Sequence, residues 1–155
     1  MLKFEYSSII DAPVEEVFGF HEEPDALEKL TPPWKRVEVL QREGGIREGG
    51  RVVLRVPIGP LRRMWVAVHT RYEKNRLFVD VQKEGPFSSW VHRHEFKGAG
   101  GRTLLTDRVT FSLPGGDLVN LIAGWWAKLE LRRLFRYRHE QTRAALSQRA
   151  RLQGR

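Results

Sequence analysis

The stretch that decides the fold is DLVNLIAGWWAKLELRRLFRYRHEQTRAALSQR, Asp117 to Arg149. A Pro-Gly-Gly segment at 114–116 breaks any preceding strand, and Asp117 offers an N-cap side chain just before an apolar run. From Asp117 to Arg149 there is no proline, and the only glycine is Gly124. The stretch therefore predicts one long helix against which the rest of the chain packs.

The later half of this helix has two faces when its residues are placed at about 100° per residue. The apolar arc, which we expect to pack inward, consists of Leu131, Leu134, Phe135, Thr142 and Ala145. The basic arc, which we expect to face water, consists of Lys128, Arg132, Arg136, His139 and Arg143. Arg138 projects into the apolar arc, so it needs an acidic partner or a wet cavity, unless its stem reaches the surface.

The earlier half of the helix is apolar over a wider arc. Its large apolar residues are Leu118, Leu121, Ile122, Trp125, Trp126 and Leu129. Either these turns are buried on more than one side, which is the interpretation we favour, or the helix bends near Gly124. In the first case Trp125 and Trp126 would narrow any pocket beside the helix.

Length and composition limit the possible classes of protein. A chain of 155 residues suits one domain, which we place at residues 1–150, with 151–155 as a frayed basic tail. There is no cysteine, which excludes disulfides and thiolate chemistry. No stretch is apolar enough to span a bilayer, and the first residues enter a strand pattern rather than a signal peptide. We therefore expect a cytoplasmic protein.

The charge is strongly basic, with a formal net value of +8. Much of the excess is arginine on the last helix. One interpretation is an anionic partner, RNA or an acidic membrane surface, that docks on Lys128, Arg132, Arg136 and Arg143. The other, which we favour, is a solvated helix face, because no aromatic-studded basic strand accompanies it.

The order of elements predicts the fold class. Residues 2–10 alternate as a half-buried strand, and two short helices follow, one after Pro13 and one around Leu27 and Leu30. The later expected strands are Val37–Gln41, Arg51–Ile58, Arg63–Glu73, Leu77–Lys83, Ser89–Lys97 and Thr103–Leu113. Hairpin succession makes an antiparallel sheet. We expect an α+β fold in which this curved sheet wraps the long helix and leaves a cavity between them.

Four segments carry a family resemblance. They are IDAPVEEVF (Ile10–Phe18), FVDVQKEGPFSSWVHRHEF (Phe78–Phe96), TDRVTFSLP (Thr106–Pro114) and LFRYRH (Leu134–His139). Together they resemble the START-like, or SRPBCC, superfamily, in a bacterial ligand-binding branch. The resemblance covers nearly the whole chain and implies the helix-grip fold. It also implies a role among lipid and quinone carriers, polyketide cyclases and dehydratases, and related binding proteins.

Two neighbouring strands bring polar residues toward one face. Alternation places Trp90, His92, His94 and Phe96 together on one strand, and Leu105, Asp107, Val109 and Phe111 together on the next. If Phe96 pairs with Thr103, then His92 lies opposite Asp107. A register shift of two residues places His94 there instead, and in both registers the two faces coincide.

A candidate pocket follows from these faces. Asp80 and Gln82 share a face of the preceding strand, and Arg138 arrives from the helix together with Phe135 and Leu131. We expect His92, Asp107 and Arg138 to be close neighbours, with Asp107 as the acidic partner of Arg138. The candidate ligand-binding residues are Trp90, His92, His94, Phe96, Asp107, Phe111, Asp80, Gln82, Arg138, Phe135 and Leu131.

Such a pocket allows three kinds of chemistry. A His-carboxylate set can satisfy a buried polar network or recognise a ligand, which is our first interpretation. His92 or His94 with Asp107 can also perform acid–base catalysis. Two histidines at i and i+2 with an aspartate can hold a metal. Two histidines on one strand whose third ligand is not placed are a weak metal signal, however, so we expect neither a metal nor a cofactor.

The expected function is therefore binding of a hydrophobic or aromatic small molecule, such as a lipid, a quinone or a polyketide-like compound. The first alternative is a cyclase, dehydratase or hydrolase that uses His92 or His94 with Asp107. The second is the RNA-docking or membrane-docking protein described above.

Overall fold

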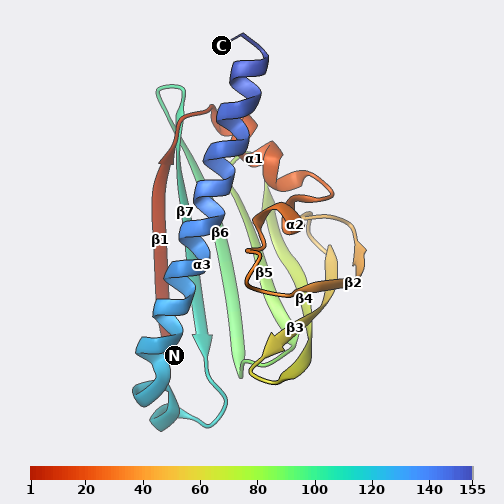
Figure 1. Ribbon diagram of the computed structural model, residues 1–155, viewed down its shortest axis with the longest axis vertical. Helices are drawn as coiled ribbons and strands as arrows, with labels where there is room; N and C mark the ends of the chain where they lie inside the picture. The colour runs from red at the N-terminus through yellow and green to blue at the C-terminus, as the bar shows by residue number, and fades with distance from the viewer. Residues whose placement is uncertain (155) are drawn as a thin grey trace.

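A computed structural model describes residues 1–154 and contains a sheet, two short helices and one long helix (Figure 1). The chain starts with β1 (Leu2–Ile10), α1 (Val14–Glu22) and α2 (Ala26–Leu30). The strands that follow are β2 (Glu38–Glu43), β3 (Arg51–Ile58), β4 (Leu61–Glu73), β5 (Leu77–Glu84), β6 (Ser89–Ala99) and β7 (Arg102–Ser112). The chain ends in α3 (Asp117–Leu152).

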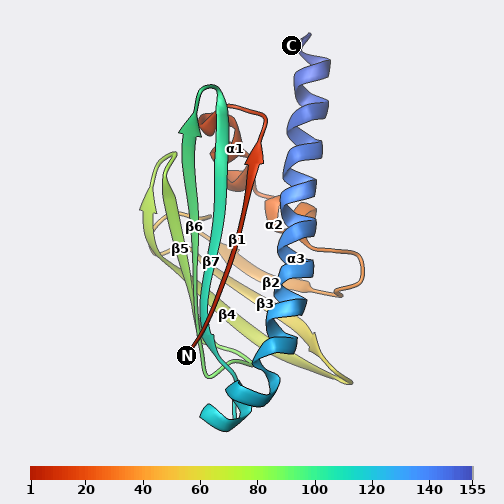
Figure 2. The ribbon, with the colours of Figure 1, turned by 90° about the vertical axis from the view of Figure 1, so that its left-hand side faces the viewer.

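The seven strands form one sheet in the order β1-β7-β6-β5-β4-β3-β2. Every pairing within the described chain is antiparallel, so the predicted sheet type is confirmed. The sheet curves, and α3 lies lengthwise along its concave side next to β1 (Figure 2). This is the helix-grip arrangement that the order of elements predicts.

The buried side of α3 follows a regular spacing of three or four residues. Its buried residues are Asn120, Gly124, Ala127, Leu131, Phe135, His139, Thr142 and Leu146. Phe135 packs against Phe4 of β1 in a tilted arrangement with ring centroids 5.6 Å apart, and Tyr6 meets His139 edge to face at 4.7 Å. These contacts attach the middle of the helix to the first strand of the chain.

The first half of α3 contradicts the expected burial. Leu118, Leu121, Ile122, Trp125, Trp126 and Leu129 all lie exposed, and we call this set the exposed apolar patch. Trp125 and Trp126 are 65% and 58% exposed, so they do not fill a pocket. The buried side here consists of Asn120, Gly124 and Ala127. Small residues let the helix approach β1 closely: a Cβ atom on Gly124 would lie 2.9 Å from Leu2 Cδ2.

The ends of α3 also differ in detail from expectation. Gly116, at φ 83°, occupies the N-cap position, and Asp117 is the first helical residue without a side-chain capping bond. Asn120 fixes the start of the helix instead, because its Oδ1 accepts a 2.8 Å hydrogen bond from the backbone N–H of Leu113. The helix continues to Leu152, past the expected end at Arg149, and Arg155 of the expected tail lies outside the described residues.

Two apolar clusters fill the space between sheet and helices. The first gathers around α1 and includes Ile10, Phe18, Phe20, Phe78, Phe96, Leu105 and Leu146. The second gathers around the middle of α3 and includes Phe4, Trp90, Val109, Phe111, Leu131 and Phe135. Among residues 1–154, no helix combines the length and the apolar character needed to cross a membrane.

Candidate functional site

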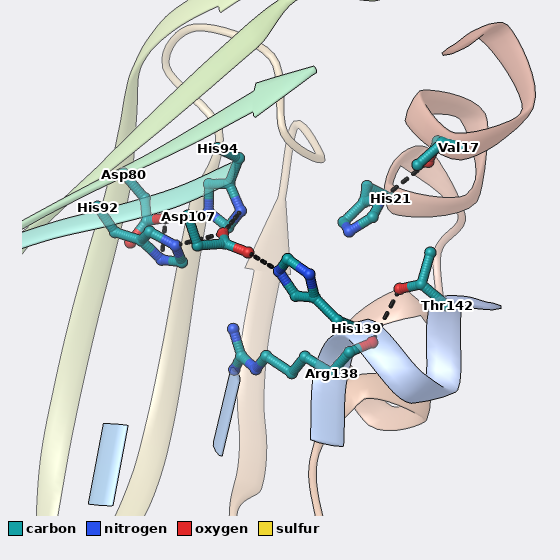
Figure 3. Close-up of polar contacts among 9 residues, drawn as sticks. All are labelled: Val17, His21, Asp80, His92, His94, Asp107, Arg138, His139 and Thr142. Carbon is teal, nitrogen blue, oxygen red and sulfur yellow. Dashed lines mark hydrogen bonds and ion pairs between the residues drawn. The ribbon is translucent and has the colours of Figure 1, made fainter. Parts of the chain in front are cut away.

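The register between β6 and β7 decides which polar side chains meet. His94 pairs with Asp107 and His92 pairs with Val109, so the first register considered above is wrong and its two-residue alternative is correct. His92 still reaches Asp107 diagonally, with Nε2 donating a 2.7 Å hydrogen bond to Oδ1. Both histidines are buried and face the helix, not solvent on the outer side of the sheet (Figure 3).

Asp107 is the centre of a buried polar cluster. Its Oδ1 also lies 3.1 Å from Nδ1 of His94, and its Oδ2 accepts a 2.7 Å hydrogen bond from Nε2 of His139. His139 is held in turn by Ser8, whose Oγ lies 2.6 Å from Nδ1. Burial alone would raise the pKa of Asp107, but hydrogen bonds from His139, His92 and His94 hold it well below its usual range. Asp107 is therefore an ionised carboxylate inside the core.

Asp80 of β5 lies on the other side of the same two histidines. Its Oδ2 accepts a 2.9 Å hydrogen bond from Nε2 of His94 and lies 3.6 Å from Nδ1 of His92. Burial would raise the pKa of Asp80, but His92 and His94 outweigh it and lower the pKa to about 2. Each histidine is thus placed between two carboxylates, one on β5 and one on β7.

The pKa values of His92 and His94 shift in opposite directions between these carboxylates. Burial opposes the charged form of both. For His94 the hydrogen bonds to Asp107 and Asp80 are stronger than this effect and raise its pKa. For His92, burial and the neighbouring His94 lower the pKa. His94 therefore holds a proton more readily than His92.

Arg138 lies beside this cluster but is not the ion-pair partner that we expected for Asp107. Within residues 1–154, no ion pair closer than 4.0 Å involves Arg138. Its guanidinium lies over the Phe135 ring at 5.4 Å, and its Nε is buried without a hydrogen-bond partner. Burial lowers the pKa of Arg138, against the attraction of Asp107 and Asp80. Asp107 is satisfied by three histidines instead, which leaves the arginine without a directly bonded anion.

The remaining candidate ligand-binding residues either belong to the two apolar clusters or lie away from the polar cluster. Trp90, Phe111, Leu131 and Phe135 belong to the second apolar cluster, and Phe96 belongs to the first. Phe135 meets His92 edge to face at 5.0 Å and so forms part of the wall of the polar cluster. Gln82 does not join it: its side-chain amide exchanges two hydrogen bonds with the backbone of Phe87 and closes the turn before β6.

The sequence reasoning missed His139, which it placed on the water-facing basic arc. The residue is 1% exposed and bonds Asp107. Its spacing gave a signal, because it lies four residues after Phe135 and three before Thr142, both of which pack inward. His21 was also missed; it lies buried on α1, with Nδ1 donating a 2.8 Å hydrogen bond to the carbonyl of Val17.

An enclosed space lies between the cluster, α2 and α3. It measures about 10 Å³ and is lined by His21, Leu30, His94, Leu105, Asp107, Arg138, His139 and Thr142. This volume holds about one water molecule. His92, expected at the cavity wall with Asp107 and Arg138, does not line it. Because the pKa values of His94 and His92 are shifted in opposite directions, the two residues are suited to the acid and base roles of an acid–base pair.

Comparison with known proteins places this architecture in a family. Residues 10–136 match the family described as polyketide cyclase / dehydrase and lipid transport. The chain therefore belongs to this START-like (SRPBCC) family. A comparison with curated proteins found no match.

Solved structures share the fold. A protein from Thermus thermophilus is 21% identical, with a TM-score of 0.70 over 93% of this chain and 99% of that one. A START superfamily protein from Mycobacterium smegmatis is 14% identical, with a TM-score of 0.68 over 94% of this chain and 97% of that one. A nucleoside-diphosphate sugar epimerase from Corynebacterium glutamicum is 26% identical, with a TM-score of 0.70. It matches 95% of this chain but only 29% of its own length.

Proposed function

We propose that this protein binds a small molecule with an apolar body and one anionic or polar group, between the sheet and α3. The observation that carries the proposal is the buried Nε of Arg138, which has no hydrogen-bond partner in the described part of the chain and belongs to a residue lining the enclosed space. A buried guanidinium nitrogen without a partner costs free energy, and an anionic ligand group would remove that cost. Family membership agrees with an apolar ligand body.

The ligand must enlarge the existing space to enter. A volume of about 10 Å³ excludes every organic molecule, so entry requires movement of the elements around it. Leu30 of α2 and His21 of α1 form one wall, and both helices are short. Separation of α1 and α2 from α3 would expose the first apolar cluster next to the polar cluster, and this would provide both kinds of contact.

Binding of 1-anilinonaphthalene-8-sulfonate and of dodecanoate tests this proposal, because each combines an apolar body with one anion. We expect Arg138→Gln to weaken binding of both at least 10-fold, while Arg136→Gln, two residues away on the exposed face, leaves binding unchanged. Equal affinities of the two variants, or no binding by the wild type, would contradict the proposal. Mass spectrometry of the same mixtures would show turnover, and its loss in His94→Gln would indicate the acid–base alternative.

A second function is favoured by the exposed apolar patch. At the helical period, this patch continues along the same side of α3 into Arg132, Arg133 and Arg136, all exposed. Exposed tryptophans next to arginines suit the boundary of an anionic bilayer, where the rings enter the interface and the guanidiniums meet headgroup phosphates. RNA would use the arginines but not the leucines. We therefore propose docking on an anionic membrane surface.

Vesicle binding followed by tryptophan fluorescence tests the docking proposal. Vesicles containing phosphatidylserine should bind the protein and shift its emission to shorter wavelength, and added salt should weaken binding. Trp125→Glu should abolish binding, whereas Met64→Glu, also at an exposed apolar residue but on β4, should not. Equal loss in both variants, or retention of an RNA oligonucleotide but not of vesicles, would overturn the proposal.

A further inference from the structure

Three side chains from two adjacent strands direct ligand-type atoms toward one point. Asp80 contributes a carboxylate oxygen, and His92 and His94 each contribute one ring nitrogen. These atoms all lie within 4.8 Å of one another, and the side chains are buried or nearly so (Figure 3). The set differs from an acidic surface cluster because imidazoles supply two of its three donors.

The distances suit a shared cation. Asp80 Oδ2 lies 2.9 Å from His94 Nε2 and 3.6 Å from His92 Nδ1. Two atoms bound to one zinc ion at about 2.0–2.2 Å lie about 2.9–3.4 Å apart, depending on the coordination geometry. The 3.6 Å separation is too long for a hydrogen bond but close to this range. Small side-chain shifts would therefore bring all three atoms to bonding distance.

The remote nitrogens of both histidines are already oriented. His92 Nε2 donates to Asp107 Oδ1 at 2.7 Å, and His94 Nδ1 lies 3.1 Å from the same oxygen. Metal-binding histidines usually direct their second nitrogen to a carboxylate, which fixes the ring orientation and makes the ligand more basic. His139 and Ser8 hold Asp107 in place in turn. Asp107 would thus be a positioning residue for both imidazoles at once.

We propose that Asp80, His92 and His94 form a binding site for a divalent first-row transition metal ion, with Zn²⁺ as its simplest occupant. Two imidazoles and one carboxylate favour this class over Mg²⁺ or Ca²⁺, which prefer oxygen ligands. Three protein ligands leave at least one coordination position free. Asp80 also pairs across the sheet with His69, whose Nδ1 is buried and has no hydrogen-bond partner among residues 1–154. The expectation that the pocket holds no metal is replaced by this proposal.

Titration of tag-free, EDTA-treated protein with Co²⁺ and Zn²⁺ tests the site. We expect one equivalent of Co²⁺ to develop the visible absorption of a protein-bound ion with fewer than six ligands, and Zn²⁺ to displace it. Zn²⁺ should also raise the melting temperature, because an ion that binds the folded state stabilises it. A spectrum that stays that of hydrated Co²⁺, with no thermal shift, would overturn the proposal.

Two variants locate the ion. Asp80→Asn keeps the size of the side chain and should lower Zn²⁺ affinity at least 10-fold. Asp11→Asn makes the same change at an exposed carboxylate far from the site and should leave affinity unchanged. Equal affinities of wild type and Asp80→Asn would contradict the assignment. If Asp80→Asn does not fold, the wild-type cobalt spectrum alone decides. The titration contains no organic ligand, and the dodecanoate assay can be run in EDTA, so the two proposals fail independently.

Discussion

The interior of this protein and the first half of α3 reverse the usual distribution of side chains. Asp107 and four histidines lie buried between sheet and helices, with Asp80 and Arg138 half-buried beside them, while two tryptophans and four aliphatic residues lie exposed on the helix surface. Burying an ionised group costs several kcal/mol unless it is well paired, and a contiguous exposed apolar patch is rare in a protein that works alone. Both regions therefore depart from the distribution of side chains that folding alone favours.

The two regions differ in whether the fold itself supplies partners for the unfavourably placed side chains. In the interior, Asp107 is satisfied inside the chain by three histidines, so the network holds itself together. The exposed apolar patch has no such partner within residues 1–154, because small residues and not the tryptophans make the contact with β1. The polar interior is compensated within the fold, whereas the patch is left exposed to solvent.

The largest expected effect separates the two sides of α3. Phe135→Ala should lower the free energy of unfolding by about 3–5 kcal/mol, because it removes a fully buried ring between Phe4 and His92. Arg136→Ala, on the next residue but exposed, should change it by less than about 0.5 kcal/mol. Urea denaturation of both variants measures the difference. Equal midpoints would show that the two sides were assigned incorrectly.

The next prediction concerns the loss of folding stability at acidic pH. Burial lowers the pKa of His21 from 6.5 to about 4, so His21 is neutral in the fold and becomes charged on unfolding below pH 6.5. The unfolded chain then binds more protons, and stability falls as the pH drops from 6.5 to about 4, by roughly 3 kcal/mol from this residue.

His21→Phe isolates this contribution. The variant should lose less stability than the wild type when urea denaturation is compared at about pH 7 and about pH 4.5. A variant as acid-sensitive as the wild type would assign the loss to the polar cluster instead of to His21.

A smaller effect tests the close approach of α3 to β1. Gly124→Leu should destabilise the fold by about 1–3 kcal/mol, because the added side chain must displace Leu2. Gly124→Ala should be nearly neutral, since its gain in helix propensity of about 1 kcal/mol offsets the contact with the flexible end of Leu2. Thermal melts of the two variants suffice. A stabilised Gly124→Leu would mean that the helix does not lie so close to the strand.

The smallest effect is expected within the exposed apolar patch. Leu121→Gln should change the free energy of unfolding by less than about 0.5 kcal/mol, because the side chain is 79% exposed. Chemical denaturation and vesicle binding of the same preparation check it. Unchanged stability with weaker vesicle binding would show that the patch, unlike the interior, serves binding and not folding. A clear loss of stability would mean that the patch is partly covered by the fold.

The fold could be predicted from sequence because its signals are local. Turn residues separate the strands, and the order of elements limits the topology. β3 begins and ends at the residues expected for it. The choice between the two registers of β6 and β7 could not be read from alternation, since a shift of two residues keeps every side chain on the same face. The hairpin turn decides it, and Gly98 pairs with Thr103.

The site was predicted less completely, because burial depends on what a helix packs against. Hydrophobicity placed Leu121 and Trp125 inside and His139 outside, and all three assignments are wrong. Packing of Gly124 against Leu2 sets the rotation of α3, and neither residue stands out in a hydrophobic pattern. Once that rotation is set, His139 must point at Asp107. The lack of an ion pair between Arg138 and Asp107 could not be foreseen for the same reason.

The pairing of β1 with β7 has a consequence for how the chain acquires its structure. Leu2 lies opposite Phe111 and Ile10 opposite Thr103, so the partners are roughly 100 positions apart. The strands from β2 to β7 are joined by short turns and pair with sequence neighbours, whereas β1 is made first on the ribosome and has no partner until β7 emerges. Since ordering so distant a contact is slow, we expect β1 and α3 to join last, onto a meander that is already formed.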